Sequence, residues 1–516
     1  MTLSAEKKYV ESLSMLETQP VEQQSEVELL RKKVQDLEQQ NEVLTELVCL
    51  LRGQKFAPKS EKASPDQLRL GDLFDEAEVS LEEEEKEETE VKSYKRGTPK
   101  RKPLPSNLPR KEEIVDLDES EKVCDECGSK LTLIGEVKSE KLDIEPMLIE
   151  IIERIRKKYA CKSCESCVKT ADLPKDPIPK SIATPGTLAF VTTSKYQDRL
   201  PLYHIEGILQ RNGVDIPRNT LANWIIKCSD LVQPLINLLE DDILGSTYLK
   251  MDETTVQVLK EQGKKPTTKS YMWLRWRAGP DPIVLFEYDP TRSSKVPQRL
   301  LEGFSGYLQV DGYVGYNEIC TKEEVIRVAC MAHIRRKFKE AAKNSKHKAR
   351  ANYALKIIQR LYDVEKKAKD KAANERLELR KEISVSEFEK LEEWLKEMKP
   401  KVAPKSLLGK AIIYALKEWE NMRHYLNDGA LDIDNNLIEN AIRPFAVGRK
   451  NWMFSNSVRG ARASANLYSL IETAKANGLE PFAYLKHIYH ELPKAETVEQ
   501  MEKLLPAQVK RDNIFS

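Results

Sequence analysis

The chain has 516 residues, and its 84 lysines and arginines nearly balance its 83 aspartates and glutamates. The net charge therefore indicates no particular partner, and the information lies in local patches of charge. No apolar run reaches membrane-spanning length, and residues 1–24 lack the apolar segment of a signal peptide, which predicts a cytoplasmic protein. Nine cysteines are too few for a disulfide scaffold, and five lie between Cys124 and Cys167, which indicates metal binding in a reducing compartment.

This length predicts several domains, and residues 1–52 contain the first, a heptad pattern that predicts a leucine-zipper coiled coil. β-branched residues at position a with Leu at position d favour a parallel dimer, and a single Asn at a fixes the register. A lone amphipathic helix packed on its own protein is the alternative, but it has no need of a buried Asn. The residues expected at the homodimer interface are Val27, Leu30, Val34, Leu37, Asn41, Leu44, Val48 and Leu51.

Residues 53–110 are acidic around Glu82 to Glu85 and then basic and proline-bearing from Tyr94 to Arg110. Such blocks cannot bury a hydrophobic core, so we expect a largely disordered linker.

Residues 111–172 carry two Cys-x-x-Cys motifs, Cys124 with Cys127 and Cys161 with Cys164. Each pair can present two thiolates to one tetrahedral Zn²⁺, which predicts a four-cysteine module with structural zinc. Cys167 is a spare that could replace Cys164, and unrelated thiols or a redox pair are the alternative. The stretches 142–146 and 148–159 are predicted to be strands.

Residues 173–240 form a proline-bearing linker followed by helices. We expect one helix over 202–211, ended by Asn212-Gly213, and a second that begins at Asn219 or Thr220 and runs through Trp224. A helix, a short glycine turn and a helix are typical of a DNA-binding helix-turn-helix, although any helical hairpin gives this pattern.

Residues 241–330 change to strand patterns. Three strands are expected over 247–259, 271–277 and 283–288, then a short helix near 299–302 and a fourth strand over 306–310. This order is that of a ribonuclease-H-like fold, in which neighbouring strands would bring Asp252 and Asp311 together. Two carboxylates side by side suit Mg²⁺, whereas either aspartate alone is equally explained as a strand-end or turn residue.

Residues 331–430 are rich in Lys, Glu, Ala and Leu and predict an all-helical insertion, and 476–516 predict a helical tail. Between them, residues 431–475 return to the core. Asp434 to Asn436 predict a helix N-terminus and Pro444 its end. Glu439 shares the polar face of that helix with Arg443. Taken alone, Glu439 is explained by a surface salt bridge to Arg443. Considered together with Asp252 and Asp311, it is explained as a third metal ligand.

Several blocks of residues carry a resemblance to a known family. They are Met251-Asp252-Glu253-Thr254, the stretch from Gly306 to Tyr313, the stretch from Cys330 to Phe338, and Asp434 to Pro444 followed by Gly448-Arg449-Lys450-Asn451-Trp452. With these blocks the chain resembles the IS-sixty-six-type insertion-sequence transposases over nearly its whole length. The chain departs from the pattern of this family at Met331, where we would expect an aromatic residue. This difference affects packing and leaves the acidic residues unchanged.

The resemblance implies a DDE transposase that frees 3′-hydroxyls at transposon ends and joins them to target DNA. It implies that Asp252, Asp311 and Glu439 are the catalytic triad and hold two Mg²⁺ ions, with Mn²⁺ as a substitute. Other carboxylates near the triad could be metal ligands instead, namely Glu253, Asp432 and Asp434. For Asp432 and Asp434, a role in a helix cap or a turn is the better explanation.

Basic and aromatic residues around the triad suit contact with DNA phosphates and bases. Trp452 is equally explained as a core aromatic. Cys330 and His333 have Cys-x-x-His spacing, but one such pair supplies too few zinc ligands, so we expect a packed helix start there with its basic residues exposed for DNA. The expected DNA contacts are Arg335, Arg336, Lys337, Arg443, Arg449, Lys450, Trp452, Arg459 and Arg462.

The alternative function is a catalytically inactive dimeric DNA-binding protein that regulates or occupies transposon ends. Its zipper, zinc module and helix-turn-helix would be the same, so only the three carboxylates discriminate. Either protein would be associated with the nucleoid of a prokaryote, and accessory transposon proteins are further candidate partners.

Overall fold

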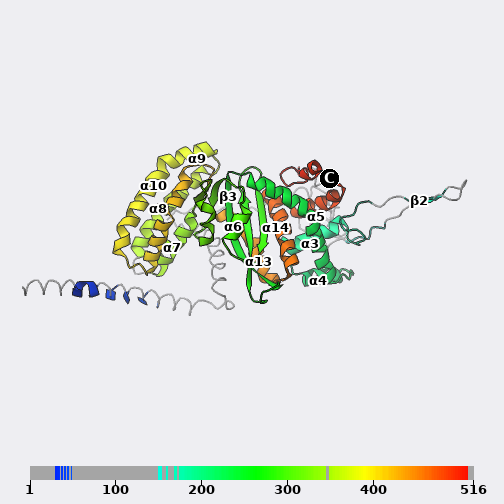
Figure 1. Cartoon of the computed structure of the whole chain (residues 1–516), viewed down its shortest axis with the longest axis horizontal. Coiled ribbons are helices and arrows are strands. Elements are labelled where there is room, and N and C mark those ends of the chain that lie inside the picture. Colours follow the sequence, from blue (N-terminus) through cyan, green and yellow to red (C-terminus); the bar gives the residue numbers. More distant parts are fainter. Residues whose placement is uncertain are drawn as a thin grey trace, which may run out of the picture. The chain divides into compact units, whose positions relative to one another are not determined.

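The structure, a computed structural model, describes residues 174–344 and 348–509, together with 149–153, 158–160, 168–170 and several positions between 29 and 48. The chain divides into two units, one of residues 74–172 and the other of residues 1–73 and 173–516. The larger unit holds the central sheet and the helices that surround it (Figure 1).

The central sheet has the strand order β5-β4-β3-β6-β7. The strands β3 (Tyr248–Lys260), β4 (Lys269–Arg277) and β5 (Ile283–Asp289) are antiparallel neighbours. On the other side of β3, β6 (Gly306–Gln309) and β7 (Val325–Val328) run parallel to it. The four expected strands are confirmed, and the short helix before the fourth, α6 (Lys295–Leu300), is present but begins earlier than the expected 299–302.

Two further strands were not indicated by the sequence pattern. They are β7, of four residues, and β8 (Ser455–Ser457), of three, which pairs with the end of β3. Both are too short to show an alternating pattern, so the sheet itself decides where they form.

Helix α14 (Val458–Ala476) closes the outer edge of β5. The backbone N–H groups of Val284 and Phe286 donate to the hydroxyls of Thr473 (3.0 Å) and Ser469 (2.7 Å). An open strand edge would offer unpaired backbone groups to other chains. The two hydroxyls take the place of a further strand and protect the edge.

Three helices precede the sheet: α3 (Pro185–Tyr196), α4 (Leu202–Arg211) and α5 (Arg218–Leu244). The expected range of α4 is confirmed, and its end at Asn212-Gly213 places Gly213 at φ 81°. The expected end of the next helix near Trp224 is wrong, because α5 continues to Leu244. Buried residues recur along all of α5, so packing rather than local propensity sets its length.

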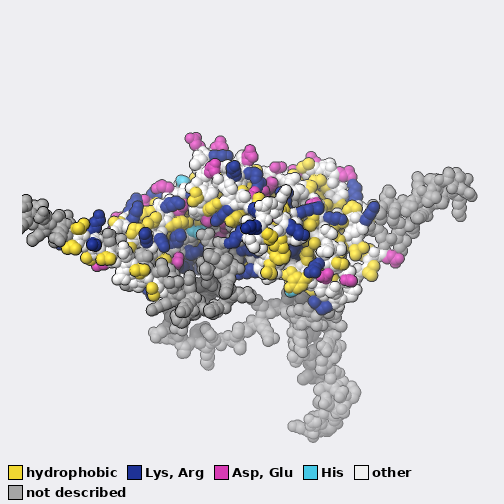
Figure 2. All heavy atoms as spheres, turned by 60° about the horizontal axis from the view of Figure 1, so that its bottom comes forward, with side chains coloured by type: hydrophobic (Ala, Val, Ile, Leu, Met, Phe, Trp, Pro, Cys, Tyr) yellow, Lys and Arg dark blue, Asp and Glu magenta, His cyan; other side chains and the backbone are white. Residues whose placement is uncertain are grey.

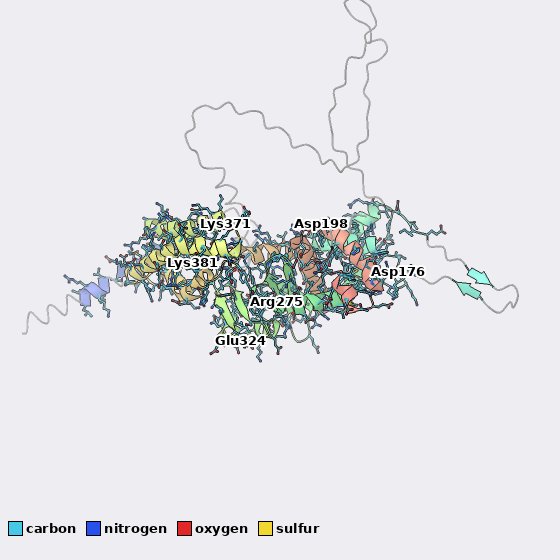
Figure 3. All side chains as sticks on the ribbon, turned by 90° about the horizontal axis from the view of Figure 1, so that it is seen from above. Asp176, Asp198, Arg275, Glu324, Lys371 and Lys381 are labelled. Atoms are coloured by element: carbon cyan, nitrogen blue, oxygen red, sulfur yellow. The ribbon has the colours of Figure 1, made fainter. Side chains whose placement is uncertain are left out.

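A buried arginine fixes α5 to the sheet. Arg275 of β4 is 2% exposed and donates to Glu240 of α5 at 2.5 Å and to the carbonyl of Leu300 at 3.0 Å. Figure 3 shows Arg275 within the sheet, away from Lys371 and Lys381 of the helical insertion.

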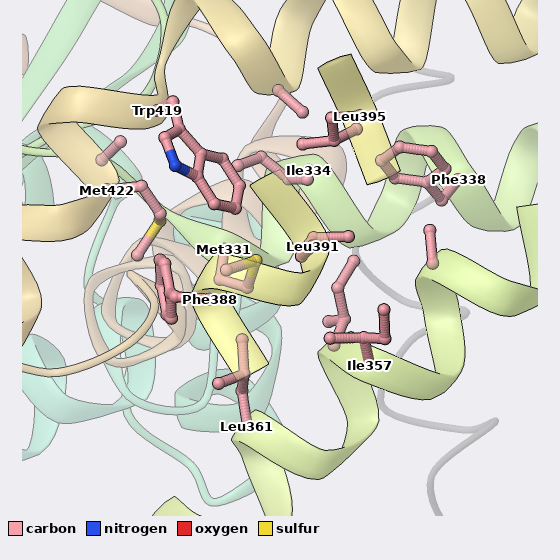
Figure 4. Packing of buried hydrophobic residues seen from close by; sticks show 14 of the residues in the cluster. Met331, Ile334, Phe338, Ile357, Leu361, Phe388, Leu391, Leu395, Trp419 and Met422 are labelled. Carbon is pink, nitrogen blue, oxygen red and sulfur yellow. The ribbon is translucent and has the colours of Figure 1, made fainter. Parts of the chain in front are cut away.

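The described residues of 331–430 form helices joined by short turns, as expected. Met331 is fully buried in their hydrophobic core, beside Phe388 and Leu361 (Figure 4), so the departure at this position does concern packing. The helices are α7 (Met331–Asn344), α8 (Lys348–Ala368), α9 (Ala373–Leu379), α10 (Val385–Met398), α11 (Leu407–Lys417) and α12 (Trp419–Arg423). Short 3₁₀ or π turns lie at Val314–Tyr316, Ile319–Thr321, Arg380–Ser384, Lys399–Lys401, His424–Leu426 and Leu492–Lys494.

Helix α13 (Asn436–Trp452) brings the chain back to the sheet, and the prediction that Pro444 ends it is wrong. Proline removes one backbone hydrogen bond from a helix interior. The residues beyond it, Phe445, Ala446 and Gly448, are buried, and their burial against the sheet offsets that loss. The tail that follows is helical as far as it is described, with α15 (Pro481–Glu491) and α16 (Val498–Glu502).

In the smaller unit, β1 (Lys158–Ala160) pairs antiparallel with β2 (Val168–Thr170). The strand predicted over 148–159 is therefore right only at its end, since residues 149–153 have no strand structure. The strand predicted over 142–146, the linker 53–110 and the Cys-x-x-Cys motifs lie outside the described residues.

The described positions between 29 and 48 are helical, as the heptad predicts. The apolar side chains among them expose about half of their surface. They are Leu30, Val34, Leu37, Leu44 and Val48; Asn41 is exposed as well, and Val27 and Leu51 lie outside the described residues. In the part of the chain that is described, no helix is long and apolar enough to cross a lipid bilayer.

Candidate active site

The parallel pairing of β3 with β6 sets Asp252 and Asp311 side by side. The last paired positions are Lys250 and Gln309. Asp252 follows Lys250 by two residues, and Asp311 follows Gln309 by two. One oxygen of each aspartate is held by the backbone: Asp252 Oδ1 accepts from Glu253 N at 2.8 Å, and Asp311 Oδ1 accepts from Tyr313 N at 2.9 Å.

Glu439 enters from a different element. It lies in the first turn of α13, which packs on β3, and only 6% of its surface is exposed. Two side chains of α7 approach its carboxylate, His333 Nδ1 at 3.9 Å and Arg336 Nη2 at 3.6 Å.

The pKa of Asp252 reflects the carboxylates that lie near it. It is raised well above its usual value by burial and by the negative charges of Glu253, Asp311 and Glu439. Burial and a neighbouring like charge both disfavour an ionised carboxylate. The structure thus brings together the three acids that the sequence indicated, in an arrangement that a bound cation would relieve.

The rival Glu253 has structural partners instead. Its side chain is 1% exposed, forms an ion pair with Arg292 and accepts a hydrogen bond from Tyr316 at 2.5 Å. Adjacent residues of a strand point to opposite faces, so Glu253 lies on the face opposite Asp252.

The other two rivals lie just before α13. Asp434 has the turn role expected of it, since its Oδ1 accepts from Asn436 N at 3.1 Å. The same expectation for Asp432 is wrong, because its carboxylate forms an ion pair with Lys250 at 2.6 Å. Asn435 is the residue before the helix, but its side chain makes no capping hydrogen bond.

Cys330, His333 and Glu439 form a cluster whose potential ligand atoms lie within 4.8 Å of one another. The Cys-x-x-His spacing indicated Cys330 and His333 as a possible ligand pair. Glu439 is distant in the sequence, so no local pattern could indicate it as the third member of this cluster. Burial, and then the charges of Asp434 and Glu439, raise the pKa of the Cys330 thiol, and its sulfur accepts from Asn435 N at 3.2 Å. Cys330 and Met331 are buried, so the packed helix start expected there is confirmed.

The basic residues of α7 are not exposed as expected. Arg335, Arg336 and Lys337 are all half-buried: Arg335 donates to Gln359 at 3.0 Å and Lys337 lies 4.6 Å from the ring centre of Tyr414. The helix packs against α8 and α11, and that packing covers the stems of these side chains.

The basic residues of α13 and α14 divide into two groups. Arg443 and Arg449 are half-buried, and Arg449 donates to Thr255 Oγ1 of β3 at 2.6 Å. Lys450, Arg459 and Arg462 are exposed, and Arg459 pairs with Asp230 at 2.7 Å.

Trp452 is half-buried at the end of α13. Its ring packs edge-on against Phe445, with a centroid separation of 5.5 Å, and Lys195 Nζ lies 5.6 Å from it. These contacts favour the interpretation as a core aromatic.

Comparison with known families gives matches along most of the chain. The model described as "Transposase IS66 family" matches residues 180–463, and "IS66 C-terminal element" matches 469–507. Residues 121–165 match "zinc-finger binding domain of transposase IS66", and 43–112 match "Transposase C of IS166 homeodomain". The zinc-finger match covers Cys124, Cys127, Cys161 and Cys164 and supports structural zinc.

Similar proteins of Sinorhizobium fredii are named only as uncharacterized. The protein y4qI is 32% identical over 492 residues, which cover 91% of this chain and 89% of y4qI. The protein y4jD is 32% identical over 424 residues, which cover 80% of this chain and 82% of y4jD. Together with the family match over residues 180–463, these relatives show that the chain belongs to the IS66 family of transposases.

Proposed function

We propose that this protein catalyses transposition by Mg²⁺-dependent phosphoryl transfer on DNA, with Asp252, Asp311 and Glu439 as its DDE triad. The observation that carries the proposal is the convergence of these three carboxylates from β3, β6 and α13, which raises the pKa of Asp252. A non-catalytic DNA-binding protein would have no need of three acids close together, one buried and two half-buried, because their mutual repulsion costs stability.

The sheet supports a ribonuclease-H-like catalytic core. Three antiparallel strands are followed by two parallel ones on the other side of the first. Asp252 stands on the first strand in chain order, and Asp311 comes two residues after the fourth. In this proposal α7 to α12 form an insertion between the second and third acids, and residues 241–330 and 431–475 form the core.

The donor set fits Mg²⁺, which takes oxygen ligands from carboxylates and keeps part of its water shell. The carboxylates of Asp252, Asp311 and Glu439 would hold it. Bound there, Mg²⁺ would activate the attacking oxygen and stabilise the departing one. The protein's own contribution is to fix the acids by backbone hydrogen bonds and to keep the site largely covered.

The reaction has two transfers at phosphorus. In the first, a water oxygen bonds to the scissile phosphorus as the bond to the 3′-oxygen breaks, which frees a 3′-hydroxyl. In the second, that hydroxyl oxygen bonds to a phosphorus of the target strand, and the target 3′-oxygen departs with a proton. Because each bond formed replaces one broken, no external energy source is needed.

Contacts to double-stranded DNA are proposed for the basic residues around the site. On the face drawn in Figure 2, Lys and Arg side chains are spread across the middle, and acidic ones lie mainly toward the upper margin. Exposed Lys450 and Arg462 are suited to phosphates as they stand. Arg335, Arg336, Arg443, Arg449 and Trp452 would engage DNA only after local rearrangement, because they are half-buried.

The remaining modules are proposed to recognise DNA and to dimerise. The pair α4 and α5 is suited to a helix-turn-helix role, and the exposed heptad residues to a coiled coil with a second copy. The zinc-finger match ends at residue 165, which supports Cys164 over Cys167 as the fourth zinc ligand. Acting on DNA, the protein would be found with the nucleoid, where accessory transposon proteins could join it.

Incubation of the full chain with labelled transposon-end DNA tests the function. We expect nicking at the end and joining to a target plasmid with Mg²⁺, and neither with EDTA. Binding of the ends without any metal-dependent cleavage would contradict the proposal and would favour the inactive DNA-binding protein.

A further inference from the structure

The loop before α13 is tied to the sheet by a buried lysine. Lys250 of β3 has a side chain only 1% exposed, and its Nζ lies 2.6 Å from Asp432 Oδ2. It also donates to the backbone carbonyl of Asp434 at 3.1 Å. The ammonium group of Lys250 thus holds both a side chain and a backbone carbonyl of this loop.

A glutamine on the neighbouring strand holds the same loop. Gln309 of β6 is fully buried and donates from Nε2 to the carbonyl of Asp432 at 2.8 Å. Its Oε1 accepts from the Tyr248 hydroxyl at 2.6 Å, and that hydroxyl accepts from Asp432 N at 3.2 Å. Both backbone groups of Asp432, its N–H and its C=O, are thus hydrogen-bonded to these side chains.

These two residues occupy equivalent places relative to the acids. Lys250 precedes Asp252 by two positions, and Gln309 precedes Asp311 by two, and the pair faces each other in the register of β3 with β6. Residues two apart on a strand point to the same face of the sheet. The loop is therefore held on the face to which the two aspartates project.

Helix α7 fixes the loop from a third side. Met331 N donates to the carbonyl of Ile433 at 3.0 Å, and Asn435 N donates to Cys330 Sγ at 3.2 Å. Glu439 follows one turn later, with its N–H on the carbonyl of Asn435 at 3.2 Å. Movement of the loop would therefore move Glu439.

We propose that Lys250 and Gln309 are positioning residues that hold the loop 432–435 and so set Glu439 opposite Asp252 and Asp311. This proposal rests on the proposed function of the triad as a metal site. A buried ion pair is weak evidence for stability, since apolar replacements often stabilise equally well. Its use here is geometric, because the charge and the amide reach two backbone carbonyls that an apolar side chain could not bind.

The test compares Lys250→Met, Asp432→Asn and the double variant of the full chain. Asp432→Asn leaves the buried ammonium group of Lys250 without its partner, so the melting temperature should fall. Lys250→Met leaves the part-exposed carboxylate of Asp432 and should lower the melting temperature less. The double variant removes both charges and should recover much of the melting temperature. It still lacks the tether to the carbonyl of Asp434, so its affinity for Mn²⁺, measured by electron paramagnetic resonance without DNA, should be at least about tenfold weaker than that of the wild type.

Two further variants make the test specific. Lys260→Met removes an exposed lysine at the other end of β3 and should bind Mn²⁺ as the wild type does. Gln309→Met removes the second tether without disturbing a charge pair and should weaken Mn²⁺ binding with a smaller loss in melting temperature. In end cleavage, the double variant should need about tenfold more Mg²⁺ at an unchanged KM for DNA.

The outcomes separate this proposal from the proposed function. A double variant with a recovered melting temperature and wild-type Mn²⁺ affinity would overturn the positioning role. If the wild type binds Mn²⁺ and the variants weaken it as expected, but no DNA is cleaved, the positioning role stands and the proposed function fails. A wild-type chain that binds no Mn²⁺ would overturn both.

Discussion

At the scale of single residues, the candidate site is a group of buried carboxylates that repel one another. Asp252 is next to Glu253 in the chain and faces Asp311 and Glu439, and together with burial these charges raise its pKa. Glu253 is compensated by Arg292. Asp252 accepts a hydrogen bond from the backbone N–H of Glu253, and a bound cation would offset its charge.

Loss of one carboxylate should abolish catalysis and spare DNA binding. Asp252→Asn, Asp311→Asn and Glu439→Gln keep the side-chain shape and remove a charged oxygen ligand, so we expect end cleavage and joining to fall by at least about 10³-fold. Gel-shift and cleavage assays on the same preparations measure both properties. Glu302→Gln is the matched control, because Glu302 is exposed. Normal strand transfer by Glu439→Gln would remove Glu439 from the site.

Lys195 should make stability depend on pH. Burial lowers its pKa to about 8, from 10.5 for an ordinary lysine. The folded state therefore binds this proton less tightly than the unfolded state, and the cost is present below pH 8 and disappears as the pH rises to 10.5. Relative to Lys195→Met, the free energy of unfolding of the wild type should rise by up to about 3 kcal/mol across that window.

Urea denaturation at intervals from pH 7.5 to 10.5 measures this difference. Lys486→Met, at an exposed position of α15, controls for the loss of a lysine as such and should show no such trend. A difference between wild type and Lys195→Met that stays constant with pH would contradict the burial of the Lys195 ammonium.

At the scale of elements, the start of β6 decides the position of Asp311. Gly306 has φ 138°, and an added Cβ would collide with the backbone carbonyl of Thr247, the residue before β3. Glycine allows the two strands to approach closely at this point. The next residue, Tyr307, then donates to Thr247 O at 2.8 Å, which begins the parallel pairing.

Gly306→Ala should lower the free energy of unfolding by about 3 kcal/mol or more, because both the dihedral angle and the contact are unfavourable. Gly303→Ala is the matched control, since Gly303 also has a positive φ, 81°, but nothing lies near its Cβ position. That control should cost only about 1 kcal/mol. Equal losses for the two variants, measured by urea denaturation, would refute the close approach of β3 and β6.

At the scale of the whole molecule, the zinc module offers a test by metal content. The full chain should carry about one zinc ion, and Cys124→Ser or Cys161→Ser should remove most of it, because a tetrahedral site needs all four ligands. Inductively coupled plasma mass spectrometry gives the amount. Cys167→Ser should retain zinc. If Cys167→Ser lost zinc and Cys164→Ser retained it, Cys167 rather than Cys164 would be the fourth ligand.

The heptad offers a second test at this scale. Changing Leu37 and Leu44 together to Lys places charges at two core d positions and should convert a dimer to a monomer at micromolar concentration. The control pair, Gln39→Lys and Glu46→Lys, lies at outward f positions of the same heptads. Sedimentation equilibrium distinguishes the two, and a core variant that remains dimeric would refute the zipper.

The sequence by itself determined what depends on local pattern. The strands that carry Asp252 and Asp311 follow from runs of β-forming residues, and helix α4 from its periodicity and its Asn-Gly stop. The juxtaposition of the two aspartates also followed from the sequence, since the order of three strands, a helix and a strand leaves few ways to pair them. Cysteine and heptad spacings are equally local signals.

Only the tertiary structure decided what depends on packing between distant segments. Local rules ended α13 at Pro444 and the second helix near Trp224, yet burial carries α13 to Trp452 and α5 to Leu244. The same burial covers Arg335 and Arg336, which local pattern placed in solvent. The sequence gives no sign that Lys250 differs from any other lysine in a strand, and its ion pair with Asp432 is seen only in the structure. Hydrophobic burial and desolvation act through space rather than along the chain, so the approach of Glu439 to the aspartates appears only in the folded protein.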